Sequence, residues 1–174
     1  MAEHFCCCLP ACLLSQSTKC AQRSIDYGAT GRWVVPCAGI NVACYYFNPW
    51  VGTDECAAET VRLQSITDSW DSAALIDDTT QYFIADHSNQ EFSCLKYVSV
   101  GMEAYMDYGT YQQKYVCTSY EYGHNTGATL TDTNGNEVYT NYDSSNYNPG
   151  GITCYTCNGN WQNIILVNFQ PVYD

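Results

Sequence analysis

Basic residues are scarce in this chain of 174 residues, which has six Lys and Arg against eighteen Asp and Glu and a net charge of −12. Nucleic-acid binding requires clustered positive charge to neutralise phosphates. We therefore expect no nucleic-acid partner, and the same shortage disfavours an anionic membrane surface.

Long apolar runs are also absent. The run "IILV" near the C-terminus has four residues, whereas a membrane-spanning helix needs about 20, so we expect no membrane span. Val, Ile, Leu and Phe together supply only 32 residues, and with this net charge such a shortage is typical of disordered chains. Sixteen Tyr, four Trp and twelve Cys oppose that interpretation, because aromatic surface and cross-links can replace aliphatic core. We expect a folded domain with a modest, covalently reinforced core.

The cysteine content favours an oxidising location, because disulfides persist outside the reduced cytosol. We therefore predict an extracellular or cell-surface protein. Residues 1–24 form a Cys-rich N-terminal arm, and residues 25–174 form a single domain.

Short β-prone runs bounded by turn residues fill the domain. They include "RWVVPCAGINVACYYF", interrupted by Pro36 and Gly39, and also "QYFIAD", "CLKYVSVGM" and "YQQKYVCTSYEY". Asn134-Gly135 and Asn158-Gly159 each lie between β-prone arms and predict two hairpins. The secondary structure of the segment 53–66 has two alternatives. It can form a helix that begins at a Thr or Asp cap, or its second half, "TVRLQSI", can form a strand because it alternates. The pattern predicts an all-β fold, an antiparallel β-sandwich of jelly-roll type.

Five cysteines lie in the arm and seven in the domain, so both counts are odd. Adjacent cysteines also rarely bridge each other. At least one bridge must leave the arm if all are oxidised, so the arm either staples its own domain or links two copies, and metal binding is a weaker third option. The inter-subunit or disulfide candidates in the arm are Cys6, Cys7, Cys8, Cys12 and Cys20. The disulfide candidates in the domain are Cys37, Cys44, Cys56, Cys94, Cys117, Cys154 and Cys157.

The arm resembles the N-terminal connector of bacterial endospore appendage subunits. The resemblance rests on Cys7-Cys8, then eleven residues, then Cys20, and on "FNPW" at positions 47–50. It implies jelly-roll subunits that stack into a fibre and are linked through disulfides of the arm.

Other chemistry-bearing residues favour structural explanations. Cys154-x-x-Cys157 is a redox pattern, but it lies on a predicted hairpin strand, where the two residues face opposite sides. A Ser-His-Asp or Cys-His site lacks a supporting motif around His87 or His124. An oxygen-rich turn and a set of acidic residues suggest a calcium loop and a glycosidase pair only superficially. These residues are Asp132, Asn134, Asn136 and Glu137 for the turn, and Glu55, Glu59, Asp68, Asp71, Asp77 and Asp78 for the acidic set.

We therefore interpret the chain as a structural subunit of a surface filament and not as an enzyme. Copies of itself are its expected partner, and it has no catalytic, cofactor-binding or metal-binding residue. The tyrosine surplus suits subunit interfaces. The alternative is a secreted carbohydrate-binding or glycoside-hydrolysing β-sandwich in which Trp50, Trp70 or Trp161 stacks on sugar, so a glycan or another surface ligand is a further candidate partner.

Overall fold

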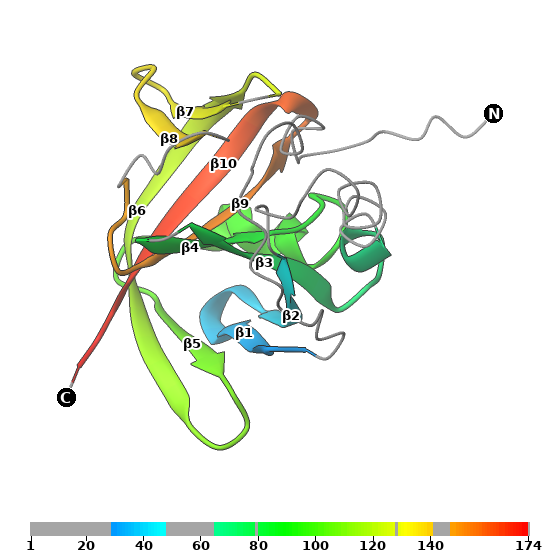
Figure 1. Ribbon diagram of the computed structural model, residues 1–174, viewed down its shortest axis with the longest axis vertical. Coiled ribbons are helices and arrows are strands. Elements are labelled where there is room, and N and C mark those ends of the chain that lie inside the picture. Colours follow the sequence, from blue (N-terminus) through cyan, green and yellow to red (C-terminus); the bar gives the residue numbers. More distant parts are fainter. Residues whose placement is uncertain (1–28, 48–64, 79, 128, 141–146, 174) are drawn as a thin grey trace, which may run out of the picture.

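The computed structural model describes residues 29–47, 65–78, 80–127, 129–140 and 147–173, and its strands form one closed barrel (Figure 1). Hydrogen bonds join the strands in the order β10-β9-β4-β3-β2-β1-β5-β6, and β10 also pairs with β6, which closes the ring. The barrel strands are β1 (Gly31–Val35), β2 (Ile40–Phe47), β3 (Ser72–Asp78), β4 (Gln81–Ala85), β5 (Glu103–Asp107), β6 (Gln112–Asn125), β9 (Ile152–Asn158) and β10 (Asn160–Pro171). The hairpin β7 (Thr129–Asp132) and β8 (Glu137–Thr140) extends the sheet from the end of β6.

Alternate residues of each strand fill the barrel, because successive side chains of a strand point to opposite faces. Trp33 of β1 lies at the centre of this interior, fully buried, with edge-on contacts to Tyr115 at 5.5 Å and Phe169 at 5.0 Å between ring centroids. The 3-10 helix η2 (Glu91–Tyr97) adds Phe92 and Leu95 to the same cluster. A second short 3-10 helix, η1 (Pro36–Ala38), joins β1 to β2.

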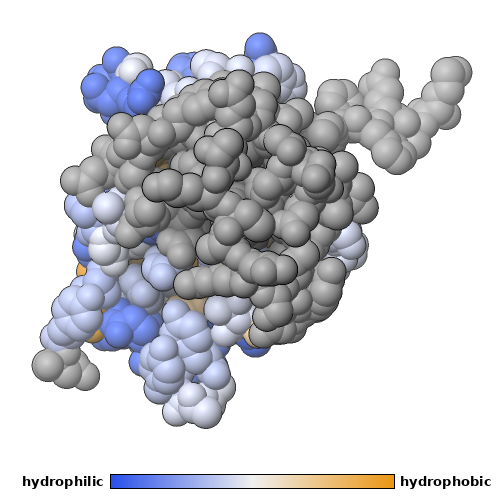
Figure 2. Space-filling model, in the orientation of Figure 1, coloured by the Kyte–Doolittle hydropathy of each residue, from blue (hydrophilic) through white to orange (hydrophobic). Residues whose placement is uncertain are grey.

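A second apolar cluster lies on the outer face of β3, β4, β9 and β10. It contains Ile76, Phe83, Tyr155 and Leu166, and the β7–β8 hairpin contributes Leu130 to it. The hairpin approaches closely because Gly123 has no side chain, and a Cβ there would lie 2.3 Å from the carbonyl oxygen of Thr131. With apolar side chains taken up by the two clusters, the described surface visible in Figure 2 is mainly hydrophilic.

The loop before β9 is anchored by a buried polar network around Asn148. Its backbone N–H donates to Gln81 Oε1 at 2.8 Å, and its side-chain amide donates to Thr153 Oγ1 at 3.2 Å. Thr153 in turn donates to Asn168 Oδ1 at 2.8 Å. The network ties the start of β9 to β4 and β10, and it therefore fixes the course of β9 toward its carboxyl end.

The all-β prediction is confirmed, but the jelly-roll sandwich is wrong. A sandwich has two separate sheets, whereas β10 here pairs with both β9 and β6 and leaves the ring without an edge. Two neighbouring pairs, β2–β3 and β4–β9, are parallel. Parallel pairing requires a crossover connection, which a meander of hairpins lacks.

Several local predictions can be compared with the strands directly. The break at Pro36 and Gly39 is confirmed, with Gly39 at φ 73°, and so are both Asn-Gly hairpins. The predicted strand "CLKYVSVGM" is wrong, because most of it belongs to η2 and the turn that follows. Residues 65 and 66, the end of the segment 53–66, are helical, so the strand "TVRLQSI" is wrong at these two residues; the rest of the segment lies outside the described residues.

The predicted arm, residues 1–24, lies outside the described residues, as do Cys56, Trp50 and most of "FNPW". The division into an arm and a domain, and the connectivity of the arm cysteines, stay predictions. Within the described segments, no helix is long and apolar enough to cross a membrane.

Candidate active site

The carboxyl ends of β4 and β9 bring a histidine and a cysteine side by side. The two strands are parallel neighbours, with Ala85 opposite Tyr155. The same register continues past β4, because Thr156 Oγ1 donates a hydrogen bond of 2.8 Å to the carbonyl oxygen of Asp86. The next pair is His87 and Cys157, and at the spacing of paired strands their backbones are roughly 5 Å apart.

Both side chains of this pair belong to the outer face of the barrel. Ala85 and Tyr155, two residues earlier on each strand, are in the outer cluster, and residues two apart on a strand share a face. His87 is 8% exposed and Cys157 is 3% exposed. When the cysteine is reduced, a thiol beside an imidazole is the minimal arrangement of a cysteine nucleophile and its general base.

The six described cysteines differ in their state. Cys157 is disulfide-bonded. The free thiols are Cys37, Cys44, Cys94, Cys117 and Cys154. The pairing of the domain cysteines as a set stays a prediction.

Three free thiols line the barrel interior and are poor nucleophiles. Burial raises the pKa of Cys44 to about 12 and that of Cys117 to about 11, and it raises the pKa of Cys154 well above its ordinary value. A thiol whose pKa is raised in this way holds little thiolate at neutral pH. Cys154 therefore packs as an apolar core residue, although it is only three residues from Cys157.

Asp68 binds the histidine from a third segment. The Nε2 atom of His87 lies 3.2 Å from Asp68 Oδ1. Asp68 follows the helical residues 65–67, and this turn is joined to the strand end because Gln90 Nε2 donates to the carbonyl oxygen of Thr67 at 2.8 Å. Asp68 and His87 are thus in contact, and the strand register places Cys157 opposite His87.

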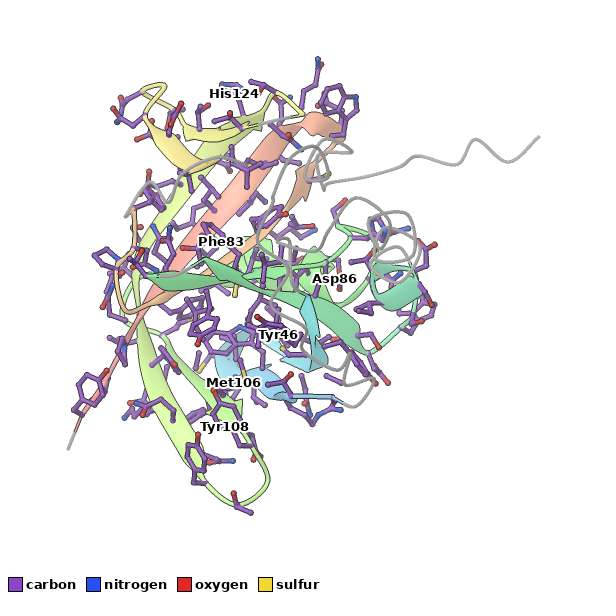
Figure 3. The ribbon with its side chains drawn as sticks, in the orientation of Figure 1. Tyr46, Phe83, Asp86, Met106, Tyr108 and His124 are labelled. Carbon is purple, nitrogen blue, oxygen red and sulfur yellow. The ribbon has the colours of Figure 1, made fainter. Side chains whose placement is uncertain are left out.

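A buried carboxyl group lies next to His87 in the sequence and accepts a hydrogen bond from it. Asp86, labelled at the end of β4 in Figure 3, is 1% exposed. Its Oδ1 accepts the backbone N–H of His87 at 2.7 Å, whereas Oδ2 has no hydrogen-bond partner among the described residues. Burial raises the pKa of Asp86 to about 8, although the backbone N–H groups of His87 and Phe92 lower it. At neutral pH the group is therefore mostly a neutral acid.

The replacement Asp86→Asn should stabilise the protein at alkaline pH. The pKa of about 8 lies above the ordinary carboxyl value of 3.8. The folding stability is therefore retained below about pH 4 and falls as the pH rises toward 8, because over this range the unfolded carboxyl group ionises and the folded one does not. Each pKa unit corresponds to about 1.4 kcal/mol, so the loss amounts to several kcal/mol. Asn resembles the neutral acid. In thermal unfolding at pH 5 and pH 8, the variant should gain Tm mainly at pH 8, and an equal change at both values would contradict the assigned pKa.

The remaining predicted sites lie elsewhere on the chain, and Glu55 and Glu59 of the acidic set lie outside the described residues. The oxygen-rich turn is a hairpin loop, because Asp132 Oδ1 accepts the N–H groups of Asn134 and Asn136 at 2.8 Å each. Among the described residues no group of three or more His, Cys, Asp or Glu side chains is arranged to hold a metal ion. Trp70 and Trp161 are exposed on separate segments, the first before β3 and the second at the start of β10.

Comparison with known proteins identifies the fold. No family model and no curated protein sequence matches the chain. Solved structures of sortases do match it. Sortase A from Corynebacterium diphtheriae, a lid mutant, aligns with a TM-score of 0.55 and 16% identity over 88% of this chain and 75% of the other. Sortase C1 from Streptococcus agalactiae gives 0.54 and 16% over 88% and 73%. Sortase C from Clostridium perfringens with the C-terminal cell wall sorting motif gives 0.52 and 14% over 84% and 72%.

The chain therefore has the fold of the sortases, which are cysteine transpeptidases, and three predictions need correction. The resemblance to endospore appendage subunits is wrong, because the domain is a sortase-type barrel and not a jelly roll. The filament subunit and its carbohydrate-binding alternative are contradicted, since the structural neighbours are enzymes. The prediction that the chain is not an enzyme is contradicted on the same ground, and no support remains for a homopolymer.

Sequence reasoning named both members of the pair but not their relation. From the sequence, Cys157 is a disulfide candidate and His87 a surface or hydrogen-bonded histidine without a supporting catalytic motif. His87 directly follows the predicted strand "QYFIAD", and Cys157 is the last residue of the β-prone run "ITCYTC". Their positions at strand ends are the signal in the sequence that could have indicated a shared site. The missing information is that β4 and β9 are parallel neighbours although 70 residues separate Asp86 from Thr156.

Proposed function

We propose that the protein is a cysteine-dependent acyl-transfer enzyme of the sortase class, with Cys157 as nucleophile and His87 as general base. The observation that carries the proposal is the placement of these two residues opposite each other at the carboxyl ends of β4 and β9. The sortase fold supports it.

The reaction follows from the two groups. The Cys157 thiol gives its proton to His87, and the sulfur attacks a peptide carbonyl carbon. The C–N bond then breaks, and the leaving amine takes the proton from the imidazolium, so that a thioester remains on Cys157. A second amine attacks the thioester, forms a new amide bond and restores the thiol.

The substrate class is an extended peptide. The apolar side chains on the outer face beside Cys157 are not an open surface, because Ala74, Phe83, Ala85 and Tyr155 are each at most 2% exposed. The proposed substrate class therefore rests on the sortase fold. The Clostridium perfringens sortase C was solved with a cell wall sorting motif, and we propose a peptide of that kind and a location at the cell surface.

The activity should depend on reduction. In the structure Cys157 is disulfide-bonded, and a disulfide sulfur cannot act as the thiolate nucleophile. A dithiol such as dithiothreitol would exchange with this bond, leaving the Cys157 thiol and the oxidised dithiol. We therefore expect acyl transfer only in reduced protein.

The test uses a labelled peptide carrying a cell wall sorting motif, with hydroxylamine as the accepting amine. Mass spectrometry should detect cleaved peptide and its hydroxamate with reduced protein and only background with oxidised protein. Equal yields in both states would contradict the role of the Cys157 thiol. A reduced protein that transfers no peptide from a panel of such motifs, at any pH between 6 and 9, would contradict the proposed function.

A further inference from the structure

We propose that Asp68 is the positioning residue of the site and holds the His87 ring by its Nε2 atom, opposite Cys157. This inference rests on the proposed function, because it concerns the same thiol and imidazole. It adds a third member from a segment that none of the strand pairings brings into the site.

The contact geometry supports an orienting role. Nε2 of His87 contacts Asp68 Oδ1 at 3.2 Å, and the described residues form no hydrogen bond with the other ring nitrogen, Nδ1. An imidazole whose Nε2–H is donated to a carboxylate has its lone pair on Nδ1, so that atom is the one available to take a proton from a thiol. Asp68 thereby selects the tautomer that the reaction needs.

The segment that carries Asp68 is held against the strand end by contacts independent of the ion pair. Gln90 Nε2 donates to the Thr67 carbonyl oxygen at 2.8 Å, and the Gln90 backbone N–H donates to the His87 carbonyl oxygen at 3.1 Å. Within the turn, Ser69 Oγ donates to the Ser65 carbonyl oxygen at 2.7 Å. These hydrogen bonds fix the turn that carries Asp68, so the position of its carboxylate next to the His87 ring does not depend on the ion pair alone.

The effect of Asp68 on His87 can be measured separately from the effects of the other titratable groups near the ring. Among the described residues, the other titratable groups at this end include Asp86 directly after β4, Glu91 at the start of η2 and Cys157 on β9. Asp86 uses Oδ1 for the His87 backbone N–H and not for the ring. A change at Asp68 leaves all of them in place. Because the Asp68 side chain is 60% exposed, its replacement should not disturb folding.

The experiment measures how fast iodoacetamide alkylates Cys157 in reduced full-length protein between pH 5 and pH 9. Fragment spectra of the digested protein assign the label to Cys157 and separate it from Cys154. The variants are Asp68→Asn, which removes the charge, and Asp68→Glu, which keeps it. Asp71→Asn is the matched control, because Asp71 is an exposed aspartate three residues along the same turn.

In the wild type, Cys157 should react at a pH well below the ordinary thiol pKa of about 8.5. Loss of the Asp68 carboxylate removes the contact that fixes the orientation and tautomer of the His87 ring, so the ring assists deprotonation of Cys157 less well. Asp68→Asn should therefore slow alkylation at pH 6 on the order of three- to tenfold and move half-maximal reactivity to higher pH. Asp68→Glu should recover part of the loss, and Asp71→Asn should match the wild type.

The outcomes separate the two proposals. A wild-type Cys157 reactive at low pH with an unchanged profile in Asp68→Asn would overturn the role of Asp68 and leave the Cys157–His87 pair standing. A wild-type Cys157 that reacts only near pH 8.5, like an isolated thiol, would overturn the pair and the proposed function with it.

Discussion

Replacement of Cys157 by Ala should abolish peptide cleavage and hydroxamate formation in reduced protein. The proposed covalent intermediate is a thioester on this sulfur, and no route to it remains without the sulfur. The loss should reach the background of the uncatalysed reaction, because no other described thiol is placed beside an imidazole by the strand register. The measurement is the yield of labelled hydroxamate after a fixed time.

Cys37→Ser is the matched control for this variant. Cys37 is a free and exposed thiol on η1, outside the site, so its removal should leave the yield unchanged. If Cys157→Ala retained activity and Cys37→Ser lost it, the assignment of the nucleophile would be wrong.

Replacement of His87 by Asn should reduce the rate constant of the first turnover by roughly 10²- to 10⁴-fold, the usual contribution of a positioned general base. Asn occupies similar space but cannot accept and return a proton at neutral pH. The residual rate should rise with pH, because hydroxide can deprotonate Cys157 without assistance once the pH approaches the thiol pKa.

The control for the histidine is His124→Asn. His124 is exposed on β6, and Figure 3 shows it near the end of the molecule opposite to Tyr108. This variant should keep the wild-type rate. A His87→Asn variant with the wild-type rate and pH profile would remove His87 from the reaction.

The secondary structure follows from local sequence where turn chemistry is strong. Gly39, Gly135 and Gly159 all have positive φ, between 73° and 83°, and each ends a run of β-prone residues, so β1, β2, β7, β8, β9 and β10 were predictable. The strands β3 and β5 were missed. Their sequences, "SAALIDD" and "EAYMD", are short and rich in Ala, Asp and Glu, which have weak strand preference.

The closure of the barrel and the active site could not be read from the sequence, because both depend on pairs distant along the chain. Sheet topology is decided by which strands pair, and the alternation pattern is the same in a sandwich and a barrel. The pair His87–Cys157 arises only from the parallel contact of β4 and β9. The Cys-rich arm carries no information about this pair, and the one disulfide-bonded cysteine among the described residues lies in the domain.

The most direct test of the central claim is the mass of the reduced protein after brief mixing with a peptide that carries a cell wall sorting motif, without an accepting amine. Digestion and fragment spectra then locate any added mass. We expect an acyl adduct on Cys157 that is released when hydroxylamine is added. An adduct on another cysteine such as Cys37, or complete absence of an adduct from a reduced and folded protein, would contradict it.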